Sequence, residues 1–277
     1  MAAERMTPVL KWAGGKTQLL EPIAANMPAE YNRYYEPFLG GAAVLFSIAP
    51  AQAFVSDINE QLINLYTQLK TAADSVIAKV NDLDSVPCTK DFYYAARKQY
   101  NERIASRSLD AECAAFMIWL NKHCFNGLYR VNSKGLFNVP YNNKVNGRSI
   151  DERNIRSISA YLQSADITLS CVDFEQACEN VSAGDFVYFD SPYVPESVTA
   201  SFTDYTMDGF TITDHERLVT LFKRLDCLGA KVMLSNNDVP WVRSMYERYQ
   251  IRPLDVKRMI NRDANKRTGK EVLITNY

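Results

Sequence analysis

The segment FVYFDSPY, residues 186–193, constrains the fold of this chain more than any other stretch. Its first four residues are aromatic or β-branched, which predicts a short buried strand. Asp190 follows at the carboxyl end of that strand, the edge where ligands bind in open α/β sheets. Pro192 ends the strand and restricts Ser191 to extended conformations. The segment therefore predicts a stiff turn that presents a carboxylate, the backbone carbonyl of Ser191 and the ring of Tyr193 together.

These three groups suit the binding of a planar amine. A carboxylate oxygen and a backbone carbonyl can each accept one N–H of an exocyclic amino group, while an aromatic ring stacks on the base that carries it. The stretch Asp190, Ser191, Pro192, Tyr193 resembles the D-P-P-Y signature of amino-group DNA methyltransferases. It departs from that signature at Ser191, where the family usually has proline. On these four residues alone, an ordinary strand followed by a turn is an equal alternative.

The stretch YYEPFLGGAAVLFSI and the AFVSDIN that follows it have the order of a nucleotide-binding βαβ unit. A strand leads to Gly40 and Gly41, a helical run follows, and a second strand ends at Asp57. Glycines after a strand let the backbone approach a ligand, and the acid after the second strand holds ribose hydroxyls in such units. The turn resembles the F-x-G-x-G motif of methyltransferases, with Phe38 first and Ala42 replacing the last glycine.

The stretch LKWAGGKTQLL, residues 10–20, contains a Gly-Lys-Thr sequence that is typical of phosphate-binding loops. That motif needs a glycine where this chain has Leu10, so the stretch does not predict an ATPase. It resembles instead the K-W-A-G-G-K opening of the DNA adenine methyltransferase (Dam) family. The resemblance implies that Trp12 and Lys16 help to close a site for S-adenosylmethionine.

The middle of the chain differs in character from its two ends. Residues 60–83 and 91–121 have helical periodicity. Residues 120–147 are rich in Asn, Gly, Lys and aromatic side chains, and a loop of this length is usually functional. The alternative is a β-hairpin with polar turns. Residues 121–158 carry a net charge of +5, as do residues 252–270, which favours contact with a polyanion, although charged runs are more often solvated faces.

Residues 120–140 also resemble the segment L-N-R-x-x-x-N-G-L-x-R-x-N-x-x-G-x-F-N-V-P of the Dam family. In that family the segment belongs to the target recognition domain, which contacts DNA. The resemblance implies that Phe125 wedges between bases and that Arg130 reads a guanine. The residues that it places at the DNA are Phe125, Asn126, Arg130, Asn132, Pro140 and Lys144.

Strand signals return in the last third of the chain. DITLSCVD, residues 166–173, ends at Asp173 and Phe174, an edge that packs the cofactor's adenine in the resemblance. A long polar loop follows the Asp190 turn, residues 213–228 predict a helix capped by Thr213 or Asp214, and AKVMLSNN and KEVLITNY predict two more strands. Strands that alternate with helices predict a doubly wound α/β sheet.

Composition points to a protein that acts in the cytoplasm. Hydrophobic residues make up 47% of the 277, none of the apolar runs is long enough to span a membrane, and the N-terminus has no signal core. The six cysteines have no CxxC spacing, so we expect reduced thiols and no metal site.

The four Dam-like segments follow the order of that family and cover nearly the whole chain. We therefore predict a Rossmann-like class I methyltransferase sheet with an inserted, mainly helical target recognition domain. The catalytic domain would comprise residues 1–60 and 165–277, and the recognition domain residues 61–164. The resemblance implies a bacterial or phage-encoded monomer that acts on double-stranded DNA, with a restriction endonuclease as a genetic partner.

The predicted activity is methyl transfer from S-adenosylmethionine to N6 of a flipped-out adenine in duplex DNA, within the sequence GATC. No metal is required. Two alternatives remain at this point. RNA adenine and DNA cytosine-N4 present a similar amine, and Tyr193 does not distinguish them. Ser191 and Ala42, which replace usual residues, would also fit a catalytically impaired DNA-binding homologue.

Overall fold

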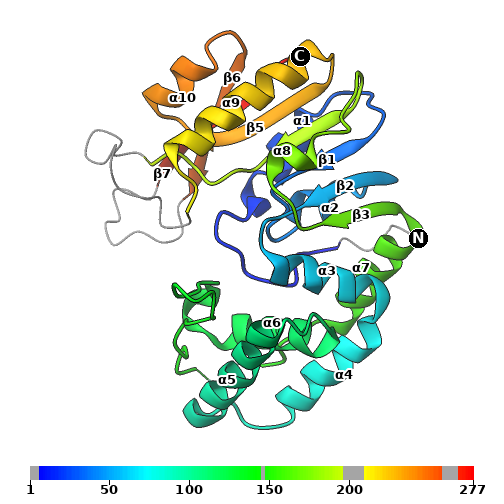
Figure 1. The fold of residues 1–277 in the computed structure, drawn as a ribbon, viewed down its shortest axis with the longest axis vertical. Helices are drawn as coiled ribbons and strands as arrows, with labels where there is room; N and C mark the ends of the chain where they lie inside the picture. The colour runs from blue at the N-terminus through cyan, green and yellow to red at the C-terminus, as the bar shows by residue number, and fades with distance from the viewer. Residues whose placement is uncertain (1–5, 145–146, 196–208, 258–267) are drawn as a thin grey trace. The chain divides into compact units, whose positions relative to one another are not determined.

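The computed structural model describes residues 6–144, 147–195, 209–257 and 268–277 (Figure 1). Most of the polar loop predicted after Asp190 lies outside these ranges, as do four of the seven basic residues predicted in the segment 252–270. The elements in chain order are η1 (Lys16–Gln18), α1 (Leu20–Ala25), β1 (Tyr34–Glu36), α2 (Ala43–Ile48), β2 (Gln52–Ser56), α3 (Glu60–Thr71), α4 (Ala73–Asp84), α5 (Lys90–Ser106), α6 (Ala111–His123), η2 (Phe125–Gly127), α7 (Glu152–Ser164), β3 (Asp166–Ser170), α8 (Phe174–Ala177), β4 (Phe186–Phe189), α9 (Ile212–Cys227), β5 (Lys231–Asn237), α10 (Pro240–Met245), β6 (Gln250–Lys257) and β7 (Thr268–Thr275).

Seven strands form one sheet in the order β3-β2-β1-β4-β5-β7-β6, which confirms the predicted α/β class. Strands β2, β1, β4 and β5 run parallel, and β7 pairs antiparallel with both β5 and β6. Because parallel strands share one carboxyl edge, the residues that follow β1, β2 and β4 are expected at one end of the strands. Strand β6 was not predicted, since its sequence QIRPLDVK has a proline and charges in place of an apolar run.

The chain forms two compact units that interleave in sequence. The first comprises Met1–Lys16, Gly40–Ala51 and Asp57–Cys171, and the second Thr17–Leu39, Gln52–Ser56 and Val172–Tyr277. In the second unit, α9 packs beside β5 through a buried face that includes Leu218, Phe222 and Leu225 (Figure 1). This core fixes the ends of β4 and β5, where the candidate site lies.

Helix α9 begins at Ile212, one residue earlier than predicted. Its N-cap is Thr211, whose hydroxyl accepts a hydrogen bond from the Asp214 N–H, and the Asp214 carboxylate accepts one from the Thr211 N–H. This reciprocal capping box places Asp214 at the third helical position, so the prediction of Thr213 or Asp214 as the cap was wrong.

The first unit is helical, with α6 at its centre. Seven consecutive residues of α6, from Ala114 to Leu120, are buried, and the helix packs against α3, α4 and α5. The predicted helical stretch 60–83 is divided between α3 and α4, and the stretch 91–121 between α5 and α6. Arg107 adopts the left-handed conformation that ends α5. Helix α7 was not predicted. In the described residues, none of the helices has the length and apolarity needed to cross a membrane.

Candidate active site

The Asp190 turn begins where a fully buried strand ends. All four residues of β4 are buried, whereas Asp190 is partly exposed. The Ser235 hydroxyl at the end of β5 donates to Asp190 Oδ1 over 3.2 Å. Ser235 Oγ in turn lies 3.0 Å from the hydroxyl of Tyr188. The predicted carboxylate is therefore presented at the sheet edge, with one oxygen held from behind by buried hydroxyl groups.

Two asparagines that follow Ser235 fasten the chain beyond the turn. The Val194 N–H donates to Asn236 Oδ1 over 3.0 Å, and Asn237 Nδ2 donates to the Val194 carbonyl over 2.7 Å. These bonds fix both backbone groups of Val194, two residues after Pro192. The sequence predicted a strand in AKVMLSNN but no role for its polar end. The available signal was the three polar residues, Ser235 to Asn237, that follow its apolar run.

Tyr193 is held by a hydrogen bond to a carboxylate. Its hydroxyl donates to Glu271 Oε2 on β7 over 2.8 Å. Burial, followed by the nearby charge of Asp190, raises the pKa of Tyr193 well above its usual value. The phenol therefore remains a neutral donor, and its ring is fixed beside Asp190. Hydrogen bonds from Ser235 to Asp190 and from Tyr193 to Glu271 therefore hold the first and last residues of the segment Asp190 to Tyr193.

Ser191 is the member of the turn that departs from the proline pattern, and among the described residues its buried hydroxyl has no hydrogen-bond partner. An unsatisfied buried hydroxyl costs about 1–3 kcal/mol relative to its solvation in water. Its side chain therefore weakens the fold, whereas its backbone carbonyl is the group predicted to bind the amine.

Ser191→Ala is expected to raise the free energy of unfolding by about 1 kcal/mol, because it removes the unsatisfied hydroxyl at almost constant shape. Urea unfolding monitored by circular dichroism would measure the change, and methyl transfer should persist. Ser191→Pro, which restores the family pattern, should also be tolerated. Ser56→Ala is the matched control, since the buried Ser56 hydroxyl donates to the Pro37 carbonyl and its loss should destabilise. Lower stability of Ser191→Ala would show that its hydroxyl has a partner.

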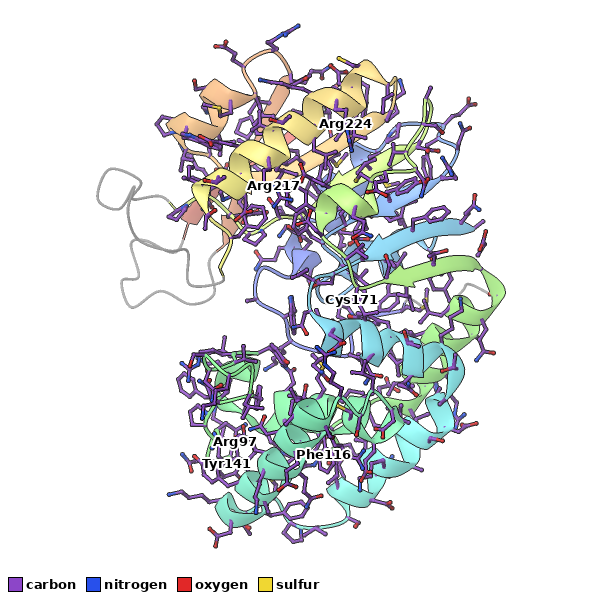
Figure 2. All side chains as sticks on the ribbon, viewed as in Figure 1. Arg97, Phe116, Tyr141, Cys171, Arg217 and Arg224 are labelled. Atoms are coloured by element: carbon purple, nitrogen blue, oxygen red, sulfur yellow. The ribbon has the colours of Figure 1, made fainter. Side chains whose placement is uncertain are left out.

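The second unit also brings together two predicted cofactor residues, Phe38 and Phe174. Their rings stack with centroids 5.4 Å apart and an interplanar angle of 27°. The Asp173 carboxylate caps α8 by accepting from the Glu175 N–H, and it pairs with Arg217 over 2.8 Å. Figure 2 labels Arg217 on α9. Its guanidinium lies 4.7 Å from the Phe174 ring centroid. Arg217 was missed by sequence reasoning, because its position on α9 carries no motif.

In the first unit, Asp57 organises the glycine turn. Its carboxylate accepts from the Gly40 N–H and from the Asn59 N–H, both over 2.9 Å. Burial raises the pKa of Asp57, and these two backbone donors oppose that effect. Ile58 next to it is 76% exposed, which is unusual for a large apolar side chain and was not predicted as a site residue.

Trp12 packs against the glycine turn. A Cβ added to Gly40 would lie 3.0 Å from Trp12 Cδ1, and one added to Gly41 would lie 3.1 Å from Trp12 Cβ. A Cβ at either position would therefore require the Trp12 side chain to shift by a few tenths of an ångström. Lys16 is buried, and its Nζ donates to the Gly14 carbonyl over 2.6 Å, which closes the turn behind Trp12. The unit thus collects Trp12, Lys16, the two glycines and Asp57 around one loop.

Ala42 ends the glycine turn in a left-handed conformation, with φ of 57°. A residue with a side chain is strained there, whereas glycine is not. The Ala42 methyl group is nevertheless fully buried, and its packing offsets part of that strain. The replacement of the usual glycine therefore leaves the turn formed.

The predicted DNA-contacting loop has a hairpin-like arrangement, with isolated bridges between Cys124 and Tyr141 and between Val131 and Phe137. Phe125 is 51% exposed on the short turn η2, and its N–H donates to the Pro140 carbonyl over 2.8 Å. Asn126 adopts φ of 56°. The turn therefore holds the backbone firmly and leaves the aromatic ring outside the core.

The polar side chains of the loop have different roles. Arg130 is exposed, and its Nε donates to Asn138 Oδ1 over 2.7 Å, which orients the guanidinium. Asn132 Oδ1 accepts from the backbone of Lys134 and Leu136, so this side chain shapes the turn. Lys144 is exposed at the far end of the loop.

The loop is also joined to the segment that carries Trp12. Asn121 on α6 exchanges two hydrogen bonds with the Lys11 backbone and donates a third to the Gly127 carbonyl over 2.9 Å. The Trp12 ring meets the Tyr129 ring with centroids 5.3 Å apart. One buried amide thus fixes both segments.

Residues 12–260 match the D12 class of N6 adenine-specific DNA methyltransferases. The chain belongs to this family. It is 40% identical to the Type II methyltransferase M1.LlaDCHI of Lactococcus lactis, over 98% of the chain and 96% of that protein. It is 42% identical to the Type II methyltransferase M.MjaIII of Methanocaldococcus jannaschii, over 98% and 99%. The DNA adenine methylase of Haemophilus influenzae is 31% identical over 96% of the chain and 92% of its own length.

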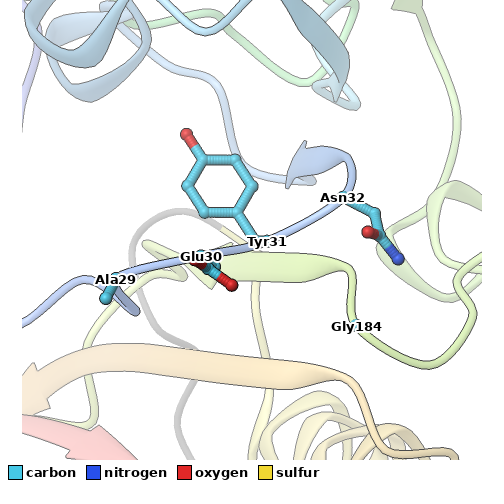
Figure 3. A pocket seen from close by; sticks show the side chains of 5 residues that line it. All are labelled: Ala29, Glu30, Tyr31, Asn32 and Gly184. Carbon is cyan, nitrogen blue, oxygen red and sulfur yellow. The ribbon is translucent and has the colours of Figure 1, made fainter.

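The methyltransferase has a further pocket of about 600 Å³, lined by Ala29, Glu30, Tyr31, Asn32 and Gly184 (Figure 3). These residues precede β1 and β4, so the pocket lies at the amino ends of the strands, away from Asp190. It has no cluster of catalytic side chains. Within the described residues, none of the groups of His, Cys, Asp and Glu has the arrangement of a metal site.

Proposed function

We propose that this adenine-specific DNA methyltransferase uses S-adenosylmethionine and methylates a flipped-out adenine within GATC. The observation that supports it most directly is the Asp190 turn, where a carboxylate, the Ser191 carbonyl and a fixed tyrosine ring meet at the sheet edge. The Asp190 carboxylate and the Ser191 carbonyl would each accept one N–H of the adenine amino group, and the Tyr193 ring would stack on the base.

The residues around the glycine turn fit the methyl donor. Gly40 and Gly41 leave room for close approach, and Asp57 at the end of β2 suits ribose hydroxyls. In the first unit, Trp12 and Lys16 belong to the proposed set, and the exposed Ile58 offers apolar surface. In the second unit, the Phe38–Phe174 pair offers apolar surface for an adenine ring, and Asp173 belongs to the proposed set. S-adenosylmethionine, when bound, supplies a methyl group on a positively charged sulfur.

The protein's own part in the reaction is to bind and orient the amine. The lone pair of adenine N6 is delocalised into the ring, and hydrogen bonds to Asp190 and the Ser191 carbonyl favour a pyramidal nitrogen. Asp190 and the Ser191 carbonyl would hold this nitrogen toward the methyl group that S-adenosylmethionine supplies, and the proton that the amine releases would pass to the Asp190 carboxylate, which accepts that N–H bond. Alignment of the two bound reactants supplies most of the remaining acceleration. The target must leave the stack, because its amine is inaccessible inside a duplex.

Residues 61–164 would form the target recognition domain, and residues 1–60 with 165–277 the catalytic domain. The loop residues Phe125, Asn126, Arg130, Asn132, Pro140 and Lys144 would face the DNA. Two relatives are named Type II methyltransferases, which supports a genetic link to a restriction endonuclease. We place the enzyme, as a monomer, in the cytoplasm of a bacterium or a phage-infected cell.

Methyl transfer from labelled S-adenosylmethionine to duplex DNA, followed by nucleoside analysis, tests the activity. We expect N6-methyladenine and no N4-methylcytosine. Label on RNA alone, or on cytosine, would favour the alternative substrates. A complete lack of transfer with normal DNA binding would favour the impaired homologue.

Phe125→Ala is expected to weaken base flipping, because an exposed ring on a rigid turn can insert between bases. Fluorescence of a 2-aminopurine at the target position would report the loss as a weaker signal. Leu109→Ala, which removes another exposed apolar side chain in the same unit, is the control. Unchanged fluorescence together with a lower melting temperature would instead assign Phe125 to anchoring of the loop.

Arg130→Ala is expected to relax specificity at one guanine by roughly ten- to a hundredfold, since a bidentate contact to guanine discriminates by about 1–3 kcal/mol. Asn138 already orients the guanidinium, so Asn138→Ala should show a weaker form of the same effect. Genome-wide mapping of methylated adenines would compare parent and variants, with Lys134→Ala as the exposed-cation control. An equal slowing at all sites would indicate a phosphate contact, and a parent motif other than GATC would overturn the proposed sequence.

A further inference from the structure

A chain of buried hydroxyl groups reaches the Asp190 carboxylate from inside the sheet. Strands β4 and β5 are parallel neighbours whose paired residues end with Phe189 and Leu234, and the residues that follow this pair are Asp190 and Ser235. The Tyr188 hydroxyl lies 3.0 Å from Ser235 Oγ, and Ser235 Oγ lies 3.2 Å from Asp190 Oδ1. Tyr188 and Ser235 are both fully buried.

The chemistry of these groups fixes which of them donates and which accepts in each hydrogen bond. An ionised carboxylate only accepts hydrogen bonds, and a serine hydroxyl has one proton to donate. Ser235 therefore donates to Asp190, and its oxygen accepts the proton of Tyr188. Burial, followed by the charge of Asp190, raises the pKa of Tyr188 well above its usual value, so the phenol remains a donor.

Acidic side chains surround these hydrogen-bonded hydroxyl groups. The other titratable groups that interact with them within the same unit include Tyr193, Glu271 on β7, and Tyr34 and Glu36 on β1. The Tyr34 hydroxyl donates to Glu36 over 2.8 Å. Neighbouring carboxylates oppose the ionisation of one another, and a hydrogen-bond donor favours the ionised form. Ser235 donates a side-chain hydrogen bond to the Asp190 carboxylate among these acids, and such a bond favours the ionised form.

We infer that Ser235 is a positioning residue for methyl transfer, which holds Asp190 ionised and in one orientation, and that Tyr188 directs the Ser235 hydroxyl toward it. The inference rests on the proposed function of Asp190 as the acceptor of the target amine. It assigns a role in the reaction to two residues that lie inside the sheet.

The test is the pH dependence of the single-turnover rate of methyl transfer to a GATC duplex. Ser235→Ala should lower the rate at neutral pH roughly tenfold and move the acid limb up by roughly one pH unit, because the carboxylate loses its donor. Tyr188→Phe should produce a smaller change in the same direction. In the double variant, Tyr188→Phe should add no further shift, since it acts through Ser235.

Two controls separate these effects from a loss of packing. Thr275→Val removes a buried hydroxyl on β7 that bonds to the Tyr277 carbonyl, and Tyr246→Phe removes a buried phenol oxygen elsewhere in the unit. Both should leave the acid limb in place. Calorimetric binding of S-adenosylmethionine and thermal melting would show that each variant is folded. If Ser235→Ala does not fold, the shift of the acid limb in Tyr188→Phe tests the inference, because phenylalanine has nearly the same volume as tyrosine.

The outcomes also distinguish this inference from the proposed function. An Asp190→Ala enzyme that retains normal turnover would remove the proposed role of Asp190 and the inference with it. The inference alone would be overturned by a different pair of results. In that case Asp190→Ala is inactive, while Ser235→Ala and Tyr188→Phe are folded and leave the acid limb of the pH profile unshifted. Equal, additive shifts from Tyr188 and Ser235 would contradict the directed chain.

Discussion

Asp190→Ala should lower the rate of methyl transfer at least about a thousandfold, because the variant loses the carboxylate that we propose accepts the target amine. The fold should remain intact. Asp190 lies at the exposed end of β4, and its carboxylate adds to the negative charge around Tyr193 and Glu271. Loss of one of two neighbouring negative charges relieves repulsion, so the melting temperature should stay the same or rise slightly.

The measurements are transfer of labelled methyl groups to duplex DNA, calorimetric binding of S-adenosylmethionine and thermal melting. Asp190→Asn separates charge from shape, since the amide can still accept a hydrogen bond from Ser235. Asp226→Ala is the matched control, because Asp226 accepts hydrogen bonds from Tyr249 and Asn276 away from the sheet edge. It should lose stability and keep its turnover. Near-normal turnover of Asp190→Ala would reject the catalytic assignment.

The strongest elements of the fold could be predicted because their signals are local. The apolar run of β4 and the glycine turn after β1 each depend on a few consecutive residues. Their order along the chain then identified the α/β class. Helix α6 lies within the predicted helical stretch 91–121, but its separation from α5 was not predicted.

The missed residues gain their meaning from contacts that are distant in sequence. Arg217 meets Asp173 across 44 positions, and Ser235 meets Asp190 across 45. Neither residue belongs to a motif, and propensity cannot show which strand end lies beside another. The N-cap of α9 was misplaced for a related reason, because Thr211, Thr213 and Asp214 all have capping side chains and only the three-dimensional bonds choose among them.

Gly40→Ala should weaken binding of S-adenosylmethionine at least about tenfold, because two effects coincide at this position. Gly40 has φ of 47°, which strains any residue with a side chain. A Cβ there would also lie 3.0 Å from Trp12 Cδ1 and 3.1 Å from Trp12 Nε1, so the indole must move. Its movement would loosen the turn that Asp57 holds through the Gly40 N–H.

Gly229→Ala provides a matched control for the strain alone. Gly229 has φ of 80°, yet an added Cβ would meet Ala183 at 3.4 Å, an ordinary contact. Both variants should lose about 1 kcal/mol of stability from the left-handed conformation. Only Gly40→Ala should lose affinity for the methyl donor, measured by calorimetry below the melting temperature of both. Equal affinities in the two variants would mean that the Gly40 turn, with Trp12 packed against it, does not form the cofactor site, and the methyl donor would have to bind elsewhere on the chain.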